Sequence, residues 1–206
     1  MKITSFKKGN KVKGTLLVYI DGEYAFSILE EEYFSLGLYE EKEITKEEIE
    51  YIQKCILFKR AKSDALRYIS FKKRTSRETA LKLEYLGYDN SIVKDVIKEL
   101  IDLNYLNDKE YAKIFLENRK RLKPKSKKML LSELKNKGIK EDIINELLYL
   151  IEFDEYKIAK MLVRKKFIKL DTLDEKLIKK IYYFLSSRGF SFELIQKIIR
   201  EIKEQC

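Results

Sequence analysis

Lysine and arginine side chains gather in three stretches that contain no acidic residue. These basic runs span residues 65–77, 118–131 and 156–170. Such densities of cations can neutralise the phosphates of a nucleic acid or contact an acidic protein surface. The alternative interpretation is a solvated loop, as most charge runs are. The candidate binding residues are Arg67, Lys72, Lys73, Arg74, Arg77, Arg119, Lys120, Arg121, Lys123, Lys125, Lys127, Lys128, Lys160, Arg164, Lys165, Lys166 and Lys169.

The positive charge of the chain is unevenly distributed. The 206 residues carry 44 Lys and Arg against 34 Asp and Glu, a net charge of +10. Residues 1–60 hold 10 basic and 11 acidic residues, so the whole excess lies in residues 61–206. A lysine-rich composition throughout the chain does not explain this difference. We therefore expect the basic part of the chain to bind an anionic partner.

The residue types exclude several kinds of catalysis. The chain has no His, and its seven glycines form neither GxxxxGK nor GxGxxG. This removes His-containing triads, the usual zinc sites and two common phosphate-binding loops. Metal chemistry by carboxylates alone stays open, although most acidic residues alternate with lysines on expected helix faces. We expect a binding protein, with no enzymatic activity, no metal and no cofactor.

Hydropathy and cysteine usage indicate the cytoplasm. No apolar run approaches the length that a bilayer requires, and residues 1–8 lack the apolar core of a signal peptide. Cys55 and Cys206 are far apart in the sequence, which suits a reducing compartment.

The first 28 residues have the pattern of short strands. Residues 15–20 are rich in branched and aromatic side chains, Asp21-Gly22 follows as a hairpin turn, and residues 24–28 form the expected return strand. Because a hairpin alone is marginally stable, we expect residues 3–7 to add a third strand and a helix to cover one face.

From Thr45 onward the pattern is helical. Pro124, the only proline, lies between two helical patterns, where it should end one helix and can open the next. Four capping boxes are expected, at Thr45/Glu48, Thr75/Glu78, Asn107/Glu110 and Thr172/Glu175.

Three glycines, Gly87, Gly138 and Gly189, recur at intervals of 51 residues in matching surroundings. A leucine precedes each by four residues, and apolar residues follow at offsets of 5, 6, 9, 10 and 13, which form one helical stripe. Each glycine is expected just beyond a helix C-terminus, where a left-handed backbone conformation is needed. The apolar positions are expected to be core.

Three alanines, Ala65, Ala112 and Ala159, recur at intervals of 47 residues and begin further apolar stripes. Each repeat is therefore expected to hold three helices. The predicted fold is mainly α, with three tandem three-helix repeats forming an elongated curved stack after a small N-terminal sheet region. The expected divisions are residues 1–60 (strand extension and linking helix), 61–108, 109–154 and 155–206 for the repeats.

The basic runs occupy equivalent places in the repeats. Lys72, Arg119 and Lys166 each follow their alanine by seven residues. In a stack, such patches would line up as a track for an anionic polymer. The nearby aromatics Tyr68 and Phe71, and Phe167 in the third repeat, are expected to be core rather than platforms for base stacking.

The chain resembles the RecX regulatory protein family over its whole length. The resemblance rests on ALRYI at 65–69, RTSRE at 74–78, KLEYLGY at 82–88, LNDKEYA at 106–112, LSELKNKGI at 131–139 and FLSSRGF at 184–190. Two features depart from the family pattern: Asn107-Asp108 replaces paired aspartates, and Pro124-Lys125-Ser126 replaces a glycine near the start of the fifth helix. We interpret both departures as capping changes.

The resemblance implies a function and brings no catalytic residues. RecX-like proteins bind RecA, lie in the groove of its filament on single-stranded DNA, and limit filament growth, ATP hydrolysis, strand exchange and the co-protease step of the SOS response. The implied partners are RecA, its DNA filament and single-stranded DNA, with non-specific duplex binding left open and a monomer expected. The motif residues Leu83, Gly87, Glu133, Leu134, Gly138, Arg188, Gly189 and Phe190 are interpreted as structural.

Two other functions fit the same residues. A direct DNA-binding regulator is one, because helix–turn–helix units also pack three helices. It would prefer a duplex sequence. A scaffold that contacts only protein is the other. It would bind RecA without DNA and with little dependence on salt.

Overall fold

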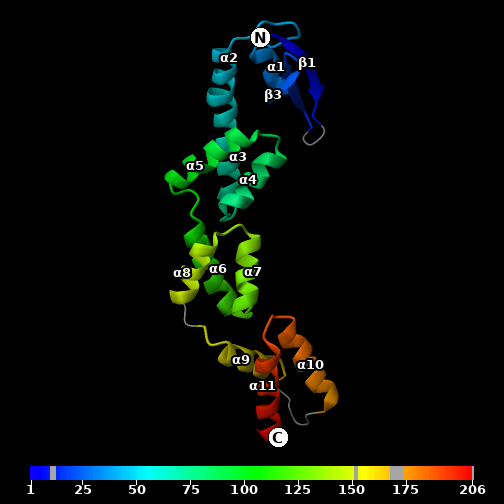
Figure 1. The fold of residues 1–206 in the computed structure, drawn as a ribbon, viewed down its shortest axis with the longest axis vertical. Helices are drawn as coiled ribbons and strands as arrows, with labels where there is room; N and C mark the ends of the chain where they lie inside the picture. The colour runs from blue at the N-terminus through cyan, green and yellow to red at the C-terminus, as the bar shows by residue number, and fades with distance from the viewer. Residues whose placement is uncertain (10–12, 151–152, 168–173, 206) are drawn as a thin grey trace. The chain divides into compact units, whose positions relative to one another are not determined.

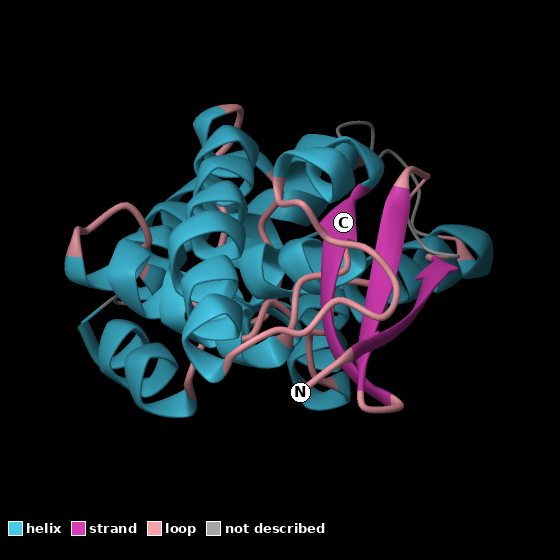
Figure 2. Ribbon diagram, turned by 90° about the horizontal axis from the view of Figure 1, so that it is seen from above, coloured by secondary structure: helices cyan, strands magenta, loops and turns pink. Residues whose placement is uncertain are grey.

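The structure, a computed structural model, describes residues 1–9, 13–150, 153–167 and 174–205. These residues are mainly helical and include a small sheet near the N-terminus (Figures 1 and 2), as the sequence predicts. The chain divides into two compact units, Met1–Asn107 and Asp108–Cys206. The first unit contains the sheet and the first repeat, and the second unit contains the other two repeats.

The sheet has three antiparallel strands in the order β1 (Ile3–Lys8), β2 (Thr15–Ile20) and β3 (Glu23–Leu29). Figure 2 shows them side by side in one twisted sheet. Asp21 and Gly22 have φ angles of 50° and 86°, which are the values of a type I′ turn. The expected hairpin and third strand are therefore confirmed.

The sheet shares one apolar core with the helices that follow it. Ile3, Val18 and Phe26 are fully buried in the same cluster as Leu57 and Ala61 of the helical segment. A short helix, α1 (Glu30–Ser35), follows β3 directly, ahead of the helical pattern that was predicted from Thr45 onward.

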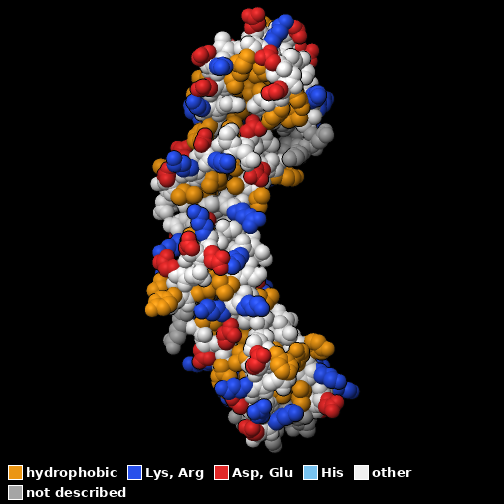
Figure 3. All heavy atoms as spheres, in the orientation of Figure 1, with side chains coloured by type: hydrophobic (Ala, Val, Ile, Leu, Met, Phe, Trp, Pro, Cys, Tyr) orange, Lys and Arg blue, Asp and Glu red, His pale blue; other side chains and the backbone are white. Residues whose placement is uncertain are grey.

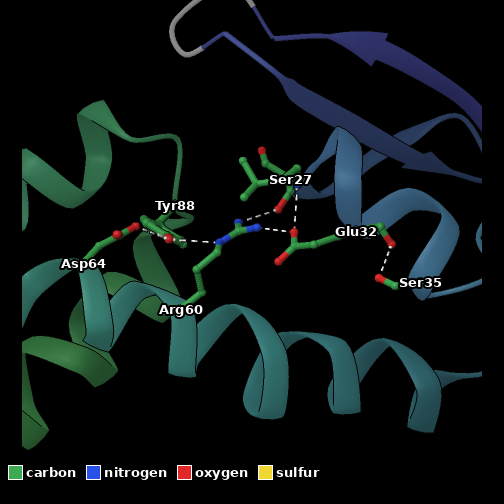
Figure 4. Close-up of polar contacts among 7 residues, drawn as sticks. Ser27, Glu32, Ser35, Arg60, Asp64 and Tyr88 are labelled. Atoms are coloured by element: carbon green, nitrogen blue, oxygen red, sulfur yellow. Dashed lines mark hydrogen bonds and ion pairs between the residues drawn. The ribbon is translucent and has the colours of Figure 1, made fainter.

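One arginine joins this sheet region to the first repeat (Figure 4). The Arg60 guanidinium is ion-paired with Glu32 of α1 and donates to the carbonyl oxygen of Ser27 at 3.4 Å. Its Nε donates to the Tyr88 hydroxyl at 2.9 Å, and that hydroxyl donates to Asp64 at 2.6 Å. The network therefore bridges β3, α1, α3 (Phe58–Ser70) and the loop after α4 (Ser76–Tyr85).

A run of helix precedes and enters the first repeat. It consists of α2 (Lys46–Tyr51), a π-helical segment η1 (Ile52–Leu57) and α3 (Phe58–Ser70). Thr45 opens it with the predicted capping box: its Oγ1 accepts from Glu48 N at 3.1 Å, and its N–H donates to Glu48 Oε2 at 2.8 Å. The π-helical turn holds one more residue than an α-helical turn and so shifts the phase of the apolar face.

Each repeat is a trio of helices, as predicted. The helices are α3, α4 (Ser76–Tyr85) and α5 (Asn90–Asp102); α6 (Asp108–Leu122), α7 (Lys127–Asn136) and α8 (Glu141–Leu150); and α9 (Glu155–Lys166), α10 (Glu175–Ser186) and α11 (Phe192–Gln205). The anchor positions are all completely buried: Ala65, Ala112, Ala159, Leu83, Leu134 and Leu185. The second and third repeats have separate apolar cores.

The three repeat glycines end their helices in the same way. Gly87, Gly138 and Gly189 have φ angles of 87°, 80° and 80°, which confirms the predicted left-handed conformation. The residue after each glycine donates its N–H to the carbonyl oxygen of the anchor leucine, at 3.1–3.3 Å. This is the Schellman arrangement, and it satisfies a carbonyl that the helix leaves unpaired.

Some local predictions were wrong, or fall outside the described residues. Pro124 follows the end of α6 but does not open α7, because Ser126 is the N-cap and its Oγ accepts from Met129 N at 3.2 Å. Thr172 lies outside the described residues, and Asp174 caps α10 by accepting from Leu177 N at 2.7 Å. Phe71 is not core: 85% of its surface is exposed.

The predicted capping box at Thr75 is present, with Oγ1 accepting from Glu78 N at 3.1 Å. The helix α6 begins at Asp108, directly after Asn107. Among the described residues, no helix combines the length and the apolar character needed to cross a bilayer.

Candidate nucleic-acid interface

The three basic runs lie at equivalent corners, where the first helix of each repeat ends. Arg67, Arg119 and Lys166 are in or near the last turns of α3, α6 and α9. A cation at a helix C-terminus is favoured by the helix dipole, so part of this charge has a purely local explanation. Lys169 lies outside the described residues.

The first run belongs to the first unit, and its cations have mixed environments. Arg67 is ion-paired with Asp64 at 2.5 Å. The Arg74 guanidinium lies 4.6 Å above the ring of Tyr68. Lys72, Lys73 and Arg77 are exposed beside the exposed Phe71.

Several cations of the other two runs are held by acidic residues outside those runs. Glu133 of α7 contacts Arg119 Nε at 3.0 Å and is also ion-paired with Lys125. Lys160 contacts Glu201 of α11 at 2.9 Å, and hydrogen bonds to Glu201 and Tyr156 raise the pKa of its ammonium group. These three cations fasten helices together within their repeats.

The second and third runs meet at one open cavity of about 770 Å³ in the second unit, which we call the basic pocket. No acidic side chain of the described residues lines it. Its cationic lining residues are Arg121, Lys123, Lys125, Lys165, Lys166 and Arg188. Its remaining lining residues are Leu122, Pro124, Met161, Leu162, Phe184 and Ser187.

Two hydrogen bonds hold the second run against the third repeat. The N–H of Ser126, just before α7, donates to the carbonyl oxygen of Arg188 at 2.9 Å. The N–H of Lys127 donates to Glu155 Oε1 of α9 at 2.6 Å. Gly189 lies so close that a Cβ there would be 2.6 Å from Ser126 Oγ. The corner after α6 is thus packed against the third repeat.

The pocket holds its cations in different ways. Arg188 donates to the carbonyl oxygen of Phe184 at 3.1 Å, and its guanidinium lies 3.8 Å from the centre of that ring. The ammonium group of Lys166 lies 4.2 Å from the same ring centre. Arg121, Lys123, Lys165 and Lys166 are exposed, so a ligand can reach them.

The remaining candidates are exposed residues around these corners. Lys120 lies on α6 and Arg164 on α9, while Lys127 and Lys128 form the first turn of α7. Figure 3 shows basic side chains in blue beside apolar ones in orange over the lower part of the view, interspersed with acidic side chains.

The sequence pattern indicated only part of this site. Arg188 was interpreted as structural, and it does donate to a carbonyl oxygen of the last turn of α10, yet it also lines the basic pocket. Leu122, Met161 and Phe184 lie in the pocket although their apolar character pointed only to packing. The basic residues on both sides of Leu122 were the one feature of the sequence that could have indicated its place in the pocket.

The described residues contain no group of three or more His, Cys, Asp or Glu side chains placed to hold a metal ion. The fold and the basic pocket therefore define a three-helix repeat protein with a cationic surface that suits an anionic partner.

Comparison with known proteins gives the family. Models of the first, second and third three-helix domains of RecX match residues 61–100, 107–148 and 154–199. The chain is 33% identical over 184 residues to regulatory protein RecX of Caldanaerobacter subterraneus, covering 88% of this chain and 90% of that one. It is 32% identical over 205 residues to regulatory protein RecX of Clostridium beijerinckii, covering 98% and 95%.

Solved structures agree with this assignment. A crystal structure of regulatory protein RecX matches with a TM-score of 0.61 and 25% identity, covering 96% of this chain and 98% of the other. The RecX structure from Lactobacillus salivarius matches with a TM-score of 0.60 and 28% identity, covering 71% and 96%. The chain belongs to the RecX family of regulatory proteins.

Proposed function

We propose that this chain binds the RecA filament on single-stranded DNA and limits filament growth, and with it ATP hydrolysis, strand exchange and SOS co-protease activity. It acts by binding and not by catalysis. The observation that carries the proposal is the basic pocket, where cations from two repeats line one cavity and none of the described residues that line it is acidic. Phosphates of filament DNA and acidic groups of RecA are the expected contacts.

The proposal assigns binding to the exposed cations and stability to the ion-paired ones. Arg67, Arg119, Lys125 and Lys160 have acidic partners within the chain. The side chains expected to carry the interaction at the pocket are Arg121, Lys123, Lys165 and Lys166. The first run, in the other unit, is proposed to contribute through the exposed residues Lys72 and Arg77.

The test is RecA ATPase on single-stranded DNA, titrated with this protein. A pocket variant carries Glu at Arg121, Lys123, Lys165 and Lys166. A control variant of equal net charge carries Glu at four exposed lysines of the same unit, Lys176, Lys179, Lys180 and Lys203. The unaltered protein and the control should slow ATP hydrolysis at similar concentrations, while the pocket variant should need at least about ten times more, a loss of about 1.4 kcal/mol.

Circular dichroism should show the same helicity for all three proteins. An unaltered protein that leaves ATP hydrolysis unchanged would remove the proposed function. Equal potency of the pocket and control variants would remove the pocket from it. Preference for one duplex sequence would favour a direct DNA-binding regulator, and RecA binding without DNA and without salt dependence would favour a scaffold.

A further inference from the structure

The basic pocket contains apolar surface that phosphate binding does not require. Leu122 has 66% of its surface exposed and Met161 has 49% exposed, and both line the cavity. A surface built only for phosphates would place polar groups at these positions. Leu162 and Phe184, by contrast, are 9% exposed and belong to the core of the third repeat.

The exposed apolar groups lie among cations from both repeats. Leu122 is flanked in the sequence by Arg121 and Lys123, and Met161 lies one helical turn before Lys165 on α9. The Phe184 ring is already in contact with Lys166 and Arg188. The surface open to a ligand is therefore aliphatic, bordered by the planar guanidinium of Arg188.

The size of the cavity also exceeds the requirement of a phosphate. About 770 Å³ lies within the range of pockets that take small organic ligands. A cavity lined by exposed apolar groups and by cations suits one nucleotide, whose base contacts the aliphatic groups while its flanking phosphates meet the cations. Arginine planes and apolar side chains are used in this way with unstacked bases.

We propose that the basic pocket receives an unstacked nucleobase of a single strand, with Leu122 and Met161 contacting the base and Arg121, Lys123, Lys165 and Lys166 contacting its backbone. This inference rests on the proposed function and specifies its ligand. A duplex keeps its bases stacked and paired, so its phosphates can meet the cations but its bases cannot contact Leu122 and Met161. The pocket should consequently distinguish single-stranded from duplex DNA without reading sequence.

The test compares an oligothymidylate with an abasic phosphodiester chain of equal length and charge, by fluorescence anisotropy without RecA. The unaltered protein should bind the oligothymidylate roughly fivefold more tightly or better, because contact with a base removes the exposed apolar surface of Leu122 and Met161 from water. A Leu122→Ala, Met161→Ala variant should lose most of this preference and keep its affinity for the abasic chain. Leu150→Ala, which removes a side chain that is 67% exposed elsewhere in the unit, should change neither.

The outcomes separate this inference from the proposed function. Base insertion is overturned if the unaltered protein binds the oligothymidylate and the abasic phosphodiester with equal affinity. It is also overturned if the double variant keeps the full preference for the oligothymidylate. Either result leaves phosphate binding by the pocket intact. Failure to bind either chain overturns DNA binding by the pocket as well. A third ligand is an acidic peptide that contains leucine. If the unaltered protein binds this peptide more tightly than the oligothymidylate, and the double variant binds it weakly, the occupant of the pocket is a protein segment and not a base.

Discussion

The carboxylate of Glu133 lies 3.0 Å from Nε of Arg119 and is also ion-paired with Lys125. Glu133 comes from α7, two residues beyond the second basic run, and its side chain is 21% exposed. Glu133 lies outside the second run, and its carboxylate thus neutralises part of the charge of that run. Reversing the charge of Arg119 would consequently perturb the fold as well as binding.

Glu133→Gln should destabilise the protein and tighten its binding to DNA. The substitution leaves two cations without their partner at a site that is mostly shielded from water, which should cost about 1–2 kcal/mol of unfolding free energy. Urea denaturation measures this cost. Glu141→Gln, which breaks an exposed pair with Lys135, is the matched control and should cost less than about 0.5 kcal/mol. Equal effects of the two substitutions would contradict the structural role of Glu133.

Gly189→Ala should be more destabilising than Gly87→Ala. Both glycines have positive φ, so alanine is strained at either position by about 1–2 kcal/mol. A Cβ at position 87 meets nothing within 4 Å, whereas one at position 189 would lie 2.9 Å from Met129 Cβ as well as against Ser126. The additional crowding should cost a further 1 kcal/mol or so. Denaturation midpoints that coincide would show that the contact between the second and third repeats is looser than described.

Arg60→Met should loosen the sheet region from the first repeat. The methionine keeps most of the apolar volume but removes hydrogen bonds to Glu32, Ser27 and Tyr88 (Figure 4). We expect a loss of about 2 kcal/mol in unfolding free energy. Lys59→Met, at an exposed neighbouring position, should be nearly neutral. Hydrogen exchange should show faster exchange in the strands of the Arg60 variant only, and unchanged exchange there would argue against the network.

Asp89 should make stability depend on pH. Burial raises the pKa of its carboxyl group, although the hydrogen bond from Tyr24 acts in the opposite direction. The folded protein therefore binds the Asp89 proton more tightly than the unfolded chain does, in which the pKa of an aspartate is near 3.8. Because of this difference, the free energy of unfolding falls as the pH rises from the unfolded-state pKa to the folded-state pKa. Asp89→Asn keeps an acceptor for Tyr24 and removes this titration.

The comparison needs unfolding free energies of both proteins from about pH 3.5 to pH 7. The stability of the asparagine variant relative to the unaltered protein should increase with pH across this range. Since all other carboxyl groups titrate in both proteins, the difference isolates Asp89. A difference that declines with pH would mean that the pKa of Asp89 is lowered in the folded protein.

The repeat architecture could be predicted because it depends on local chemistry. Only glycine adopts the required backbone conformation without strain at Gly87, Gly138 and Gly189, and the stripes follow from the period of a helix. The hairpin at Asp21-Gly22 was predictable for the same reason. The intervals of 51 and 47 residues in the sequence therefore predicted the three trios of helices that the structure contains.

The candidate site could be predicted only in part, because it depends on contacts between distant residues. The runs without acidic residues marked where the cations lie. The sequence of these runs did not indicate that Glu133 and Glu201 would form ion pairs with cations in them. Likewise, Phe71 is a large apolar residue of the kind that usually lies in a core. Its exposure follows from the tertiary packing, which the local sequence does not indicate. The apolar lining at Leu122 and Met161 depends on contact between the second and third repeats, which the local sequence does not indicate.

The central claim is that exposed cations of the basic pocket neutralise DNA phosphates. Its most direct test is the salt dependence of binding to single-stranded DNA for the unaltered protein, the pocket variant and the control variant. Each phosphate contact on a single strand contributes about 0.7 to the slope of log K against log salt, so losing four contacts should reduce the slope by about 2–3. The account predicts this reduction in the pocket variant and little change in the control. Equal slopes for those two variants would contradict it.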